Sequence, residues 1–254
     1  MRYLRTFINW LIEKIGGNMR ITLLPPDAPF TGDMEMPFRE LYKACSPYTM
    51  TSVERMYAVY KAAEHVVRNN IPGDFVECGV WKGGCAMMAA LTFQKFGDTK
   101  RNIYLYDTYE GMTQPSDKDV KHNGERPEKK WQTSQRDAHN DWCYSSLDEV
   151  KSNLARTKYP REQLIFVKGK VEETLPKTTP EQVAILRLDT DWYESTKHEL
   201  IHLYPKLSSD GVLLLDDYGH WQGAKQATDE YIEEHKLSLI LHRIDYTGRS
   251  ATKR

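Results

Sequence analysis

Short β-branched or aromatic runs alternate with amphipathic segments over about 170 residues of this chain, from Asp74 onwards. The runs typical of strands cover residues 75–78, 103–107, 164–168, 183–189, 212–216 and 237–244. The segments with helical spacing cover residues 85–96, 147–155, 194–207 and 223–234. This alternation predicts an α/β fold with a doubly wound, mostly parallel sheet and helices on both faces. Ligands bind beyond the carboxyl ends of such strands, so we expect the functional site there.

The 254 residues suffice for one α/β domain and are short for two. Residues 4–15 predict an amphipathic helix, and the prolines between residues 25 and 37 predict that residues 16–47 are irregular. Thr51 with Glu54 forms a capping box that starts a helix reaching to about Val67. We therefore predict an N-terminal helical arm over residues 1–50 and one domain over residues 51–254. The arm is a candidate contact for a homo-oligomer.

The charge balance excludes several partners. Lys and Arg number 35 against 36 Asp and Glu, so no global field draws the chain to nucleic acid or to an acidic membrane. The apolar run at residues 7–12 is too short for a secretion signal or a membrane span. The four cysteines form no CxxC pair, which is typical of reduced thiols. We expect a cytoplasmic protein with neither nucleic acid nor membrane as a partner.

Residues 108–145 form a long polar segment that follows directly on a predicted strand. Loops of this length inside a compact domain are usually lids, binding loops or disordered segments. We predict a lid over the site that is mobile without ligand and becomes ordered when ligand binds.

The turn after the first predicted strand reads Glu77-Cys-Gly-Val-Trp-Lys-Gly-Gly84, and the second strand ends at Asp107. An acid at that position suits a cofactor with an adenosine moiety, because it accepts from both ribose hydroxyls. Trp81 stands where a dinucleotide turn needs glycine, which argues against NAD. S-adenosylmethionine has no phosphates and carries an amino acid tail, so it fits a wider turn beside Glu77. The alternatives are a tight turn without ligand and Asp107 as a helix cap.

Acidic residues follow two later strands. Asp189 and Asp191 end one of them, and Asp216 with Asp217 ends the next. If these strands are neighbours, about 4.8 Å apart, the carboxylates come close and repel one another unless a cation neutralises them. Ligands that are all oxygen favour Mg²⁺, Mn²⁺ or Ca²⁺ over zinc or copper. The alternative is that these acids are caps or pair with Arg187 and Lys225.

At these residues the chain resembles the macrocin O-methyltransferase family, which includes the mycinamicin and novobiocin deoxysugar methyltransferases. The resemblance covers about residues 48–243. It rests on Phe75-Val-Glu-Cys-Gly-Val-Trp-Lys-Gly-Gly84, on Asp107 with Glu110-Gly111, on Leu188-Asp-Thr-Asp-Trp-Tyr-Glu-Ser-Thr196, and on Asp216-Asp217-Tyr218.

The resemblance implies a class I methyltransferase fold with a seven-stranded sheet, S-adenosylmethionine as methyl donor, and Mg²⁺, or Mn²⁺ in its place, bridging vicinal hydroxyls of the substrate. The implied metal ligands are Asp189, Asp216 and Asp217, and the implied general base is Asp191, although either Asp189 or Asp191 can reach the metal. The residues expected around the cofactor are Glu77, Gly79, Val80, Trp81, Gly83, Asp107, Thr108, Val171, Glu172 and Asp189. The residues expected around the acceptor are Tyr48, Met50, Met56, His139 and Trp142, of which Met56 also suits the core.

The expected acceptor is a small molecule that carries a sugar, such as a deoxysugar of a glycosylated natural product or a surface glycan. Two alternatives stay open. A catechol or phenol methyltransferase shares the cofactor and the metal but uses a lysine base shortly after the first acid, where this chain has Trp192 and Tyr193. That difference favours an alcohol over a phenol as the methyl acceptor. A catalytically silent cofactor-binding module is the second alternative, although none of the metal acids is missing.

Overall fold

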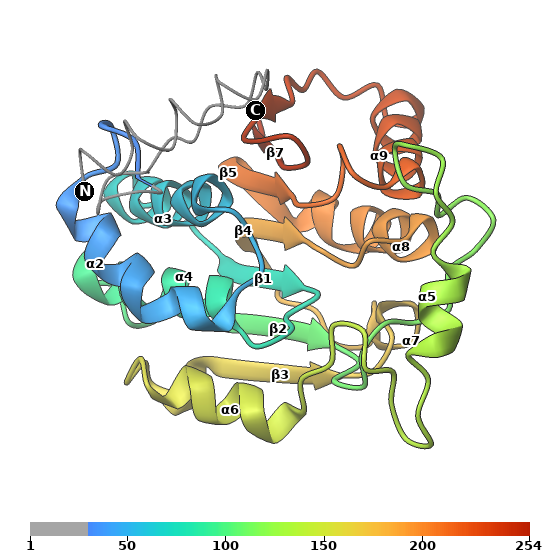
Figure 1. The fold of residues 1–254 in the computed structure, drawn as a ribbon. Coiled ribbons are helices and arrows are strands. Elements are labelled where there is room, and N and C mark those ends of the chain that lie inside the picture. The colour runs from blue at the N-terminus through green and yellow to red at the C-terminus, as the bar shows by residue number, and fades with distance from the viewer. Residues whose placement is uncertain (1–29) are drawn as a thin grey trace, which may run out of the picture. The chain divides into compact units, whose positions relative to one another are not determined.

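A seven-stranded sheet forms the centre of the protein, which a computed structural model describes over residues 30–254 (Figure 1). The strands lie in the order β3-β2-β1-β4-β5-β7-β6, and β1 to β5 are parallel. β7 pairs antiparallel with both β5 and β6. The strands are β1 (Asp74–Cys78), β2 (Ile103–Asp107), β3 (Leu164–Lys168), β4 (Val183–Leu188), β5 (Leu207–Leu215), β6 (His242–Arg243) and β7 (Arg249–Thr252). This sheet confirms the predicted fold class.

Helices cover both faces of the sheet, as the alternation predicted. On one face α2, α3, α4 and α6 contact one another in sequence, and on the other α8 contacts α7 and α9 (Figure 1). The helices are α2 (Met36–Cys45), α3 (Val53–Arg68), α4 (Gly84–Lys95), α5 (Glu128–Thr133), α6 (Leu147–Ala155), α7 (Val171–Thr174), α8 (Tyr193–Leu203) and α9 (Gln222–Glu234), with short 3₁₀ turns at Ser46–Tyr48, Arg161–Gln163 and Tyr204–Lys206. Residues 36–254 form one compact unit.

The register of the central strands brings the future site residues to one edge. β4 is buried along its whole length between β1 and β5, which is typical of a parallel strand covered on both faces. Cys78 pairs with Leu188, and Leu188 pairs with Leu215. The loops that follow Cys78, Leu188 and Leu215 therefore begin next to one another at the same edge of the sheet. The strand order reverses between β1 and β4, which is where open α/β sheets bind ligands.

The N-terminal part of the described chain differs from the prediction in two places. Helix α2 lies in the segment that was expected to be irregular, because a proline in the first turn of a helix loses no hydrogen bond. The ring of Phe38 on α2 is buried against Tyr57 of α3, with 4.9 Å between ring centroids. The cap of α3 is Ser52, whose hydroxyl accepts from the Arg55 N–H at 3.2 Å, so the assignment of Thr51 was wrong by one residue. The predicted helix at residues 4–15 lies outside the described residues.

The C-terminal part differs as well. The strand predicted over residues 237–244 is reduced to the two residues of β6, and Leu237, Leu239 and Leu241 pack on the core from an irregular segment. Strand β7 was not predicted, because only Ala251 of its four residues is buried and no apolar pattern marks it. In the described part of the chain, no helix combines the length and the apolar character needed to cross a membrane.

The segment of residues 108–145 contains α5 and runs past the starts of α8 and α9 (Figure 1). Tyr193 is the first residue of α8, and its N–H donates to the buried carboxylate of Asp119 at 2.7 Å. Lys121 forms an antiparallel bridge with Trp221, the residue before α9. The segment is thus attached to the same end of the domain at which the parallel strands finish.

Candidate functional site

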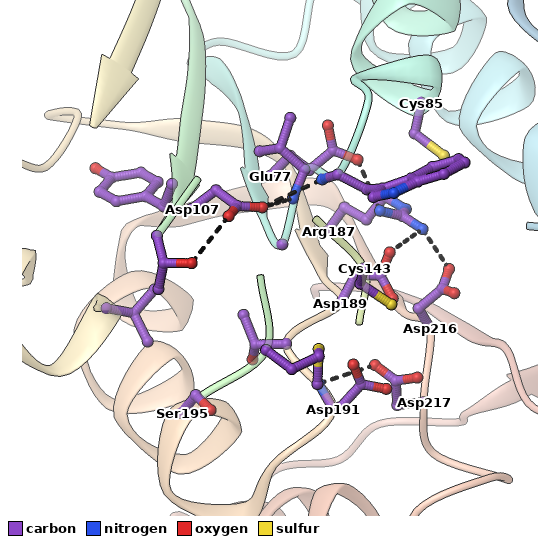
Figure 2. A pocket seen from close by; sticks show the side chains of 18 of the residues that line it. Glu77, Cys85, Asp107, Cys143, Arg187, Asp189, Asp191, Ser195, Asp216 and Asp217 are labelled. Atoms are coloured by element: carbon purple, nitrogen blue, oxygen red, sulfur yellow. Dashed lines mark hydrogen bonds and ion pairs between the residues drawn. The ribbon is translucent and has the colours of Figure 1, made fainter. Parts of the chain in front are cut away.

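A pocket lies at the carboxyl ends of the parallel strands (Figure 2). Residues 48–51 and part of the 108–145 segment complete its wall. Most of the residues predicted for the site line it together: Tyr48, Met50, Glu77, Gly79, Val80, Trp81, Asp107, Thr108, Val171, Glu172, Asp189, Asp191, Asp216 and Asp217. Residues that are up to 169 positions apart in the chain therefore share one cavity, because the sheet brings its strand ends together.

The turn after β1 lies close against the end of β4. Gly79 has a φ of +82°, and a Cβ atom there would overlap the carbonyl oxygen of Asp189, so only glycine fits. Asp107 holds the next two residues: its carboxylate accepts from the Val80 N–H at 2.7 Å and from the Trp81 N–H at 3.2 Å. Burial raises the pKa of Asp107 even though these donors lower it. Asp107 thus shapes the cofactor turn, whatever it contacts in the ligand.

A buried arginine connects the acids beneath the pocket. Arg187 Nη1 lies 2.7 Å from Glu77 Oε1, and Nη2 lies 2.8 Å from Asp189 Oδ2 and 2.6 Å from Asp216 Oδ1 (Figure 2). Burial raises the pKa of Glu77 to about 7, although Arg187 lowers it. Within the described residues, Glu77 Oε2 is buried without a hydrogen-bond partner, and Glu77 lines the pocket. An unsatisfied carboxylate oxygen in this position fits the ammonium group of a methionine moiety.

Asp189, Asp216 and Asp217 form the carboxylate cluster. One oxygen of each lies within 4.8 Å of the others. Burial raises the pKa of Asp189 and Asp217 well above the ordinary value, and repulsion from the neighbouring acids adds to this. Arg187 and Arg55 pair with Asp216, whereas Asp217 makes no salt bridge among the described residues. The raised pKa values indicate that Arg187 and Arg55 alone do not stabilise three ionised carboxylates at this spacing. An added cation would do so, and an all-oxygen donor set of this kind fits Mg²⁺ or Mn²⁺.

Asp191 lies at the edge of this cluster in a constrained position. Its φ is +68°, which is rare for a residue other than glycine, and its N–H donates to Asp217 Oδ2 at 3.2 Å (Figure 2). The Trp221 indole N–H donates to its carboxylate. Burial, and then the charge of Asp189, raises the pKa of Asp191 to about 7.

Four predicted residues do not line the pocket. Gly83 is the N-cap residue of α4 and has a φ of +87°. A Cβ atom there would clash with the Leu154 side chain. Met56 is fully buried and lies beside the Cys85 thiol, so it belongs to the core. His139 stacks on the Tyr144 ring with centroids 4.0 Å apart. Trp142 packs against two other tryptophans.

Other residues take part that the sequence reasoning missed. The 108–145 segment contributes Met112, Thr113 and Cys143 to the pocket. Arg187 was named from the sequence only as an alternative ion-pair partner of the acids, and it does pair with Asp189 and Asp216. Lys225, the other such partner, pairs with Asp229 instead. The position of Arg187 in the sequence is distinctive, because it is a charged residue within an otherwise apolar strand. Arg55 has no such signal, because an arginine in the first turns of a helix is usually solvated.

Comparisons with known proteins cover the same part of the chain. The sequence model of a family described as Macrocin-O-methyltransferase (TylF) matches residues 42–252. Demethyldecarbamoylnovobiocin O-methyltransferase of Streptomyces niveus is 32% identical over 201 residues, which are 79% of this chain and 74% of that protein. The 8-demethyl-8-(2,3-dimethoxy-alpha-L-rhamnosyl)-tetracenomycin-C 4'-O-methyltransferase of Streptomyces olivaceus is 30% identical, with the same coverage of both chains. A solved structure of the O-methyltransferase NovP, 32% identical, superposes with a TM-score of 0.71 over 81% of this chain and 82% of that chain.

Proposed function

The chain belongs to the macrocin O-methyltransferase family and is an S-adenosylmethionine-dependent O-methyltransferase, and from this premise we propose that it methylates a sugar hydroxyl with the help of a divalent cation. The observation that carries the proposal is the carboxylate cluster of Asp189, Asp216 and Asp217 at the ends of two neighbouring strands, beside the cofactor turn. In this proposal these three residues hold Mg²⁺ or Mn²⁺, and Asp191 is the general base.

The reaction breaks the bond between the methyl carbon and the sulfonium of the donor and forms a bond from that carbon to the acceptor oxygen. The hydroxyl proton moves to the Asp191 carboxylate, and S-adenosylhomocysteine is the second product. When bound, the cation supplies positive charge that lowers the pKa of a coordinated hydroxyl. The chain itself orients donor and acceptor, and positioning of this kind contributes roughly 7–11 kcal/mol in well-aligned reactions.

The donor-binding residues of the proposal are Glu77 for the ammonium group, the turn at Gly79–Trp81, and Asp107 with Thr108 for the ribose; Val171 and Glu172 line the same pocket. The unsatisfied Oε2 of Glu77 supports this direction for the amino acid tail. The acceptor then lies between the carboxylate cluster and residues 48–51, where Tyr48 and Met50 line the wall.

The class of acceptor is inferred from relatives and from the site. The name of the Streptomyces olivaceus relative places its methyl group on a rhamnosyl tetracenomycin. A catechol methyltransferase has its lysine base shortly after the first acid, where this chain has Trp192 and Tyr193, so the sequence favours an alcohol acceptor. A panel of glycosides and catechols separates the two classes. Faster turnover of catechols than of every glycoside would assign the chain to the phenol class.

The metal ligands and the general base should respond differently to substitution. Asp189→Asn, Asp216→Asn and Asp217→Asn each remove a ligand, so we expect all three to lose both Mn²⁺ affinity and turnover. Asp191→Asn keeps the shape of the site, so we expect Mn²⁺ affinity close to wild type and a rate about 10²–10⁴-fold lower. Calorimetric Mn²⁺ titration and initial rates measure the two properties separately.

Chelation tests the cation directly. EDTA should abolish turnover, and Mg²⁺ or Mn²⁺ should restore it. Full activity in EDTA would remove the cation from the reaction. If Asp191→Asn lost the metal and Asp189→Asn kept it, Asp191 would be the metal ligand and Asp189 the general base. The reaction class would be unchanged.

We also propose a cytoplasmic location and a small-molecule acceptor as the main partner, without nucleic acid or membrane. Support for a reducing compartment comes from Cys45, Cys78, Cys85 and Cys143, all of which are free thiols. Association through the N-terminal arm stays a prediction, since most of the arm lies outside the described residues.

A further inference from the structure

Trp221 is a buried residue that the proposed reaction does not yet use. It precedes α9 directly, and only 3% of its surface is exposed. Its indole N–H donates to Asp191 Oδ1, while its own backbone N–H donates to the Asp217 carbonyl at 3.0 Å. One residue thus contacts the proposed base through its side chain and a proposed metal ligand through its main chain.

The indole ring is held independently of Asp191. The Trp192 ring packs against it at 4.9 Å between centroids and an interplanar angle of 71°, and the Trp142 ring packs at 6.2 Å. His220 contacts it at 4.9 Å, nearly edge-on. The bridge to Lys121 fixes its backbone. Because the ring has little freedom to turn, the direction of its N–H is set before any substrate binds.

Asp191 needs such a restraint. Its carboxylate lies beside that of Asp217, and its backbone is in the left-handed region (Figure 2). Nothing about packing requires an N–H at this position, because a phenylalanine ring would fill most of the same space. The donor therefore has a use beyond filling the core: it holds one oxygen of Asp191, and so sets the plane of a carboxyl group that also contacts the Asp217 carboxyl.

We infer that Trp221 is a positioning residue that orients the Asp191 carboxylate for proton transfer. The inference rests on the proposed function, in which Asp191 is the base. It also connects the 108–145 segment to the chemistry, because the rings that hold Trp221 include Trp142 of that segment, and Trp192 donates through Nε1 to the Thr113 carbonyl at 3.1 Å.

Trp221→Phe removes the donor and keeps an aromatic ring. We expect kcat to fall about 10- to 100-fold, the range in which small misplacements of reacting groups act. The KM values for donor and acceptor and the Mn²⁺ affinity should stay near wild type. The matched control is Trp192→Phe, which removes an indole N–H from the same cluster but not from Asp191. Its effect on kcat should be clearly smaller.

A double-mutant cycle separates positioning from packing. In the Asp191→Asn background, where the base is already lost, Trp221→Phe should cost little further rate. An equal loss in both backgrounds, or a wild-type kcat in Trp221→Phe, would overturn the inference. Thermal unfolding of each variant shows whether the fold is kept.

The hydrogen bond is also measurable without turnover. In ¹⁵N-labelled protein the Trp221 indole resonance, assigned with Trp221→Phe, should move in Asp191→Asn, whereas that of Trp192 should stay. An unmoved Trp221 resonance overturns the inference. Absence of methyl transfer from wild type to every acceptor, or wild-type rates in Asp191→Asn, would instead overturn the proposed function, so the two failures are distinct.

Discussion

Glu199 on α8 is a fully buried carboxyl group, and among the described residues neither of its oxygens makes a hydrogen bond of ordinary geometry, although the nearby Thr190 hydroxyl lowers its pKa. Burial raises the pKa of Glu199 well above its ordinary value, and the charges of Glu172 and Asp217 add to this. We therefore expect Glu199 to keep its proton in the folded protein at a pH where the unfolded chain has lost it. Above the pKa of an unfolded glutamate, about 4.3, the unfolded chain releases this proton and the folded protein does not, so the free energy of unfolding falls as the pH rises.

Glu199→Gln removes this cost, so we expect the variant to be more stable than wild type at pH 7.5. The difference should shrink as the pH falls toward about 4.3, because the unfolded glutamate is then protonated too. Each kcal/mol gained corresponds to about 2–4 °C in Tm for a chain of this size. Thermal unfolding across this pH range measures the effect, with the exposed Glu194 of the same helix as control. A gain that does not depend on pH would show that Glu199 is ionised in the folded protein.

At the level of single residues, the sequence pointed to the acids because they follow two consecutive strands of a sheet that was predicted to bind a cofactor. Their positions after two strands predicted that Asp189, Asp216 and Asp217 lie together, and the register of β4 with β5 brings them together. Arg55 could not be found in this way, because its partner Asp216 lies 161 positions away and only the packing of α3 joins them. Trp221 was missed because an apolar residue before a helix is usually core.

At the level of elements, the 108–145 segment is held by specific contacts rather than by a core of its own. The Trp131 indole N–H donates to the Met112 carbonyl at 3.0 Å, and the Asn140 N–H donates to the Glu110 carbonyl at 2.7 Å. Cys143 lines the pocket from this segment with a φ of +56°, and it is more exposed than the other three cysteines. Its reactivity therefore reports on whether the segment opens.

We expect a thiol reagent to modify Cys143 first, at a rate that depends on opening of the segment. Burial raises the pKa of Cys143, so the closed form should react slowly. If S-adenosylhomocysteine with Mg²⁺ holds the segment closed, the rate should fall about 100-fold at a ligand concentration of about 100 Kd. Mass spectrometry of the modified protein measures this, with Cys143→Ser as control. Fast modification that the ligand does not slow would mean that the segment is no lid.

The elements that the sequence predicted well are those with a strong apolar pattern. β4 and α4 are almost wholly buried, and their apolar runs stand out in the sequence. α2 was missed because Pro37 was interpreted as a break although it lies in the first turn. β7 was missed because its residues are polar and its place is decided by pairing with β5. Pairing between distant segments is not encoded in a local pattern.

For the whole molecule, the pocket predicts which ligand stabilises the fold. A ligand that binds only the folded protein adds about 2.7 kcal/mol at 100 Kd, which corresponds to roughly 5–10 °C in Tm. We expect S-adenosylhomocysteine to give such a shift and NAD to give none, because Trp81 occupies the position that a dinucleotide needs free. Asp107→Ala should reduce the shift, since Asp107 holds the turn that carries Val80 and Trp81, and should leave Mn²⁺ binding intact. A shift with NAD and none with S-adenosylhomocysteine would contradict this.

The antiparallel pairing of β7 with β5 has a consequence for synthesis on the ribosome. β5 ends directly before Asp216 and Asp217, yet its partner on that side emerges more than 30 residues later. At about 5–20 residues per second, the nascent chain exposes one unpaired edge of β5 for seconds, with five consecutive residues that are buried in the finished fold. An open apolar edge is a site for aggregation. Chains that stop before Arg249 should therefore need a chaperone to stay in solution, and the strand that leads into two of the three cluster acids is among the last to gain its full set of neighbours.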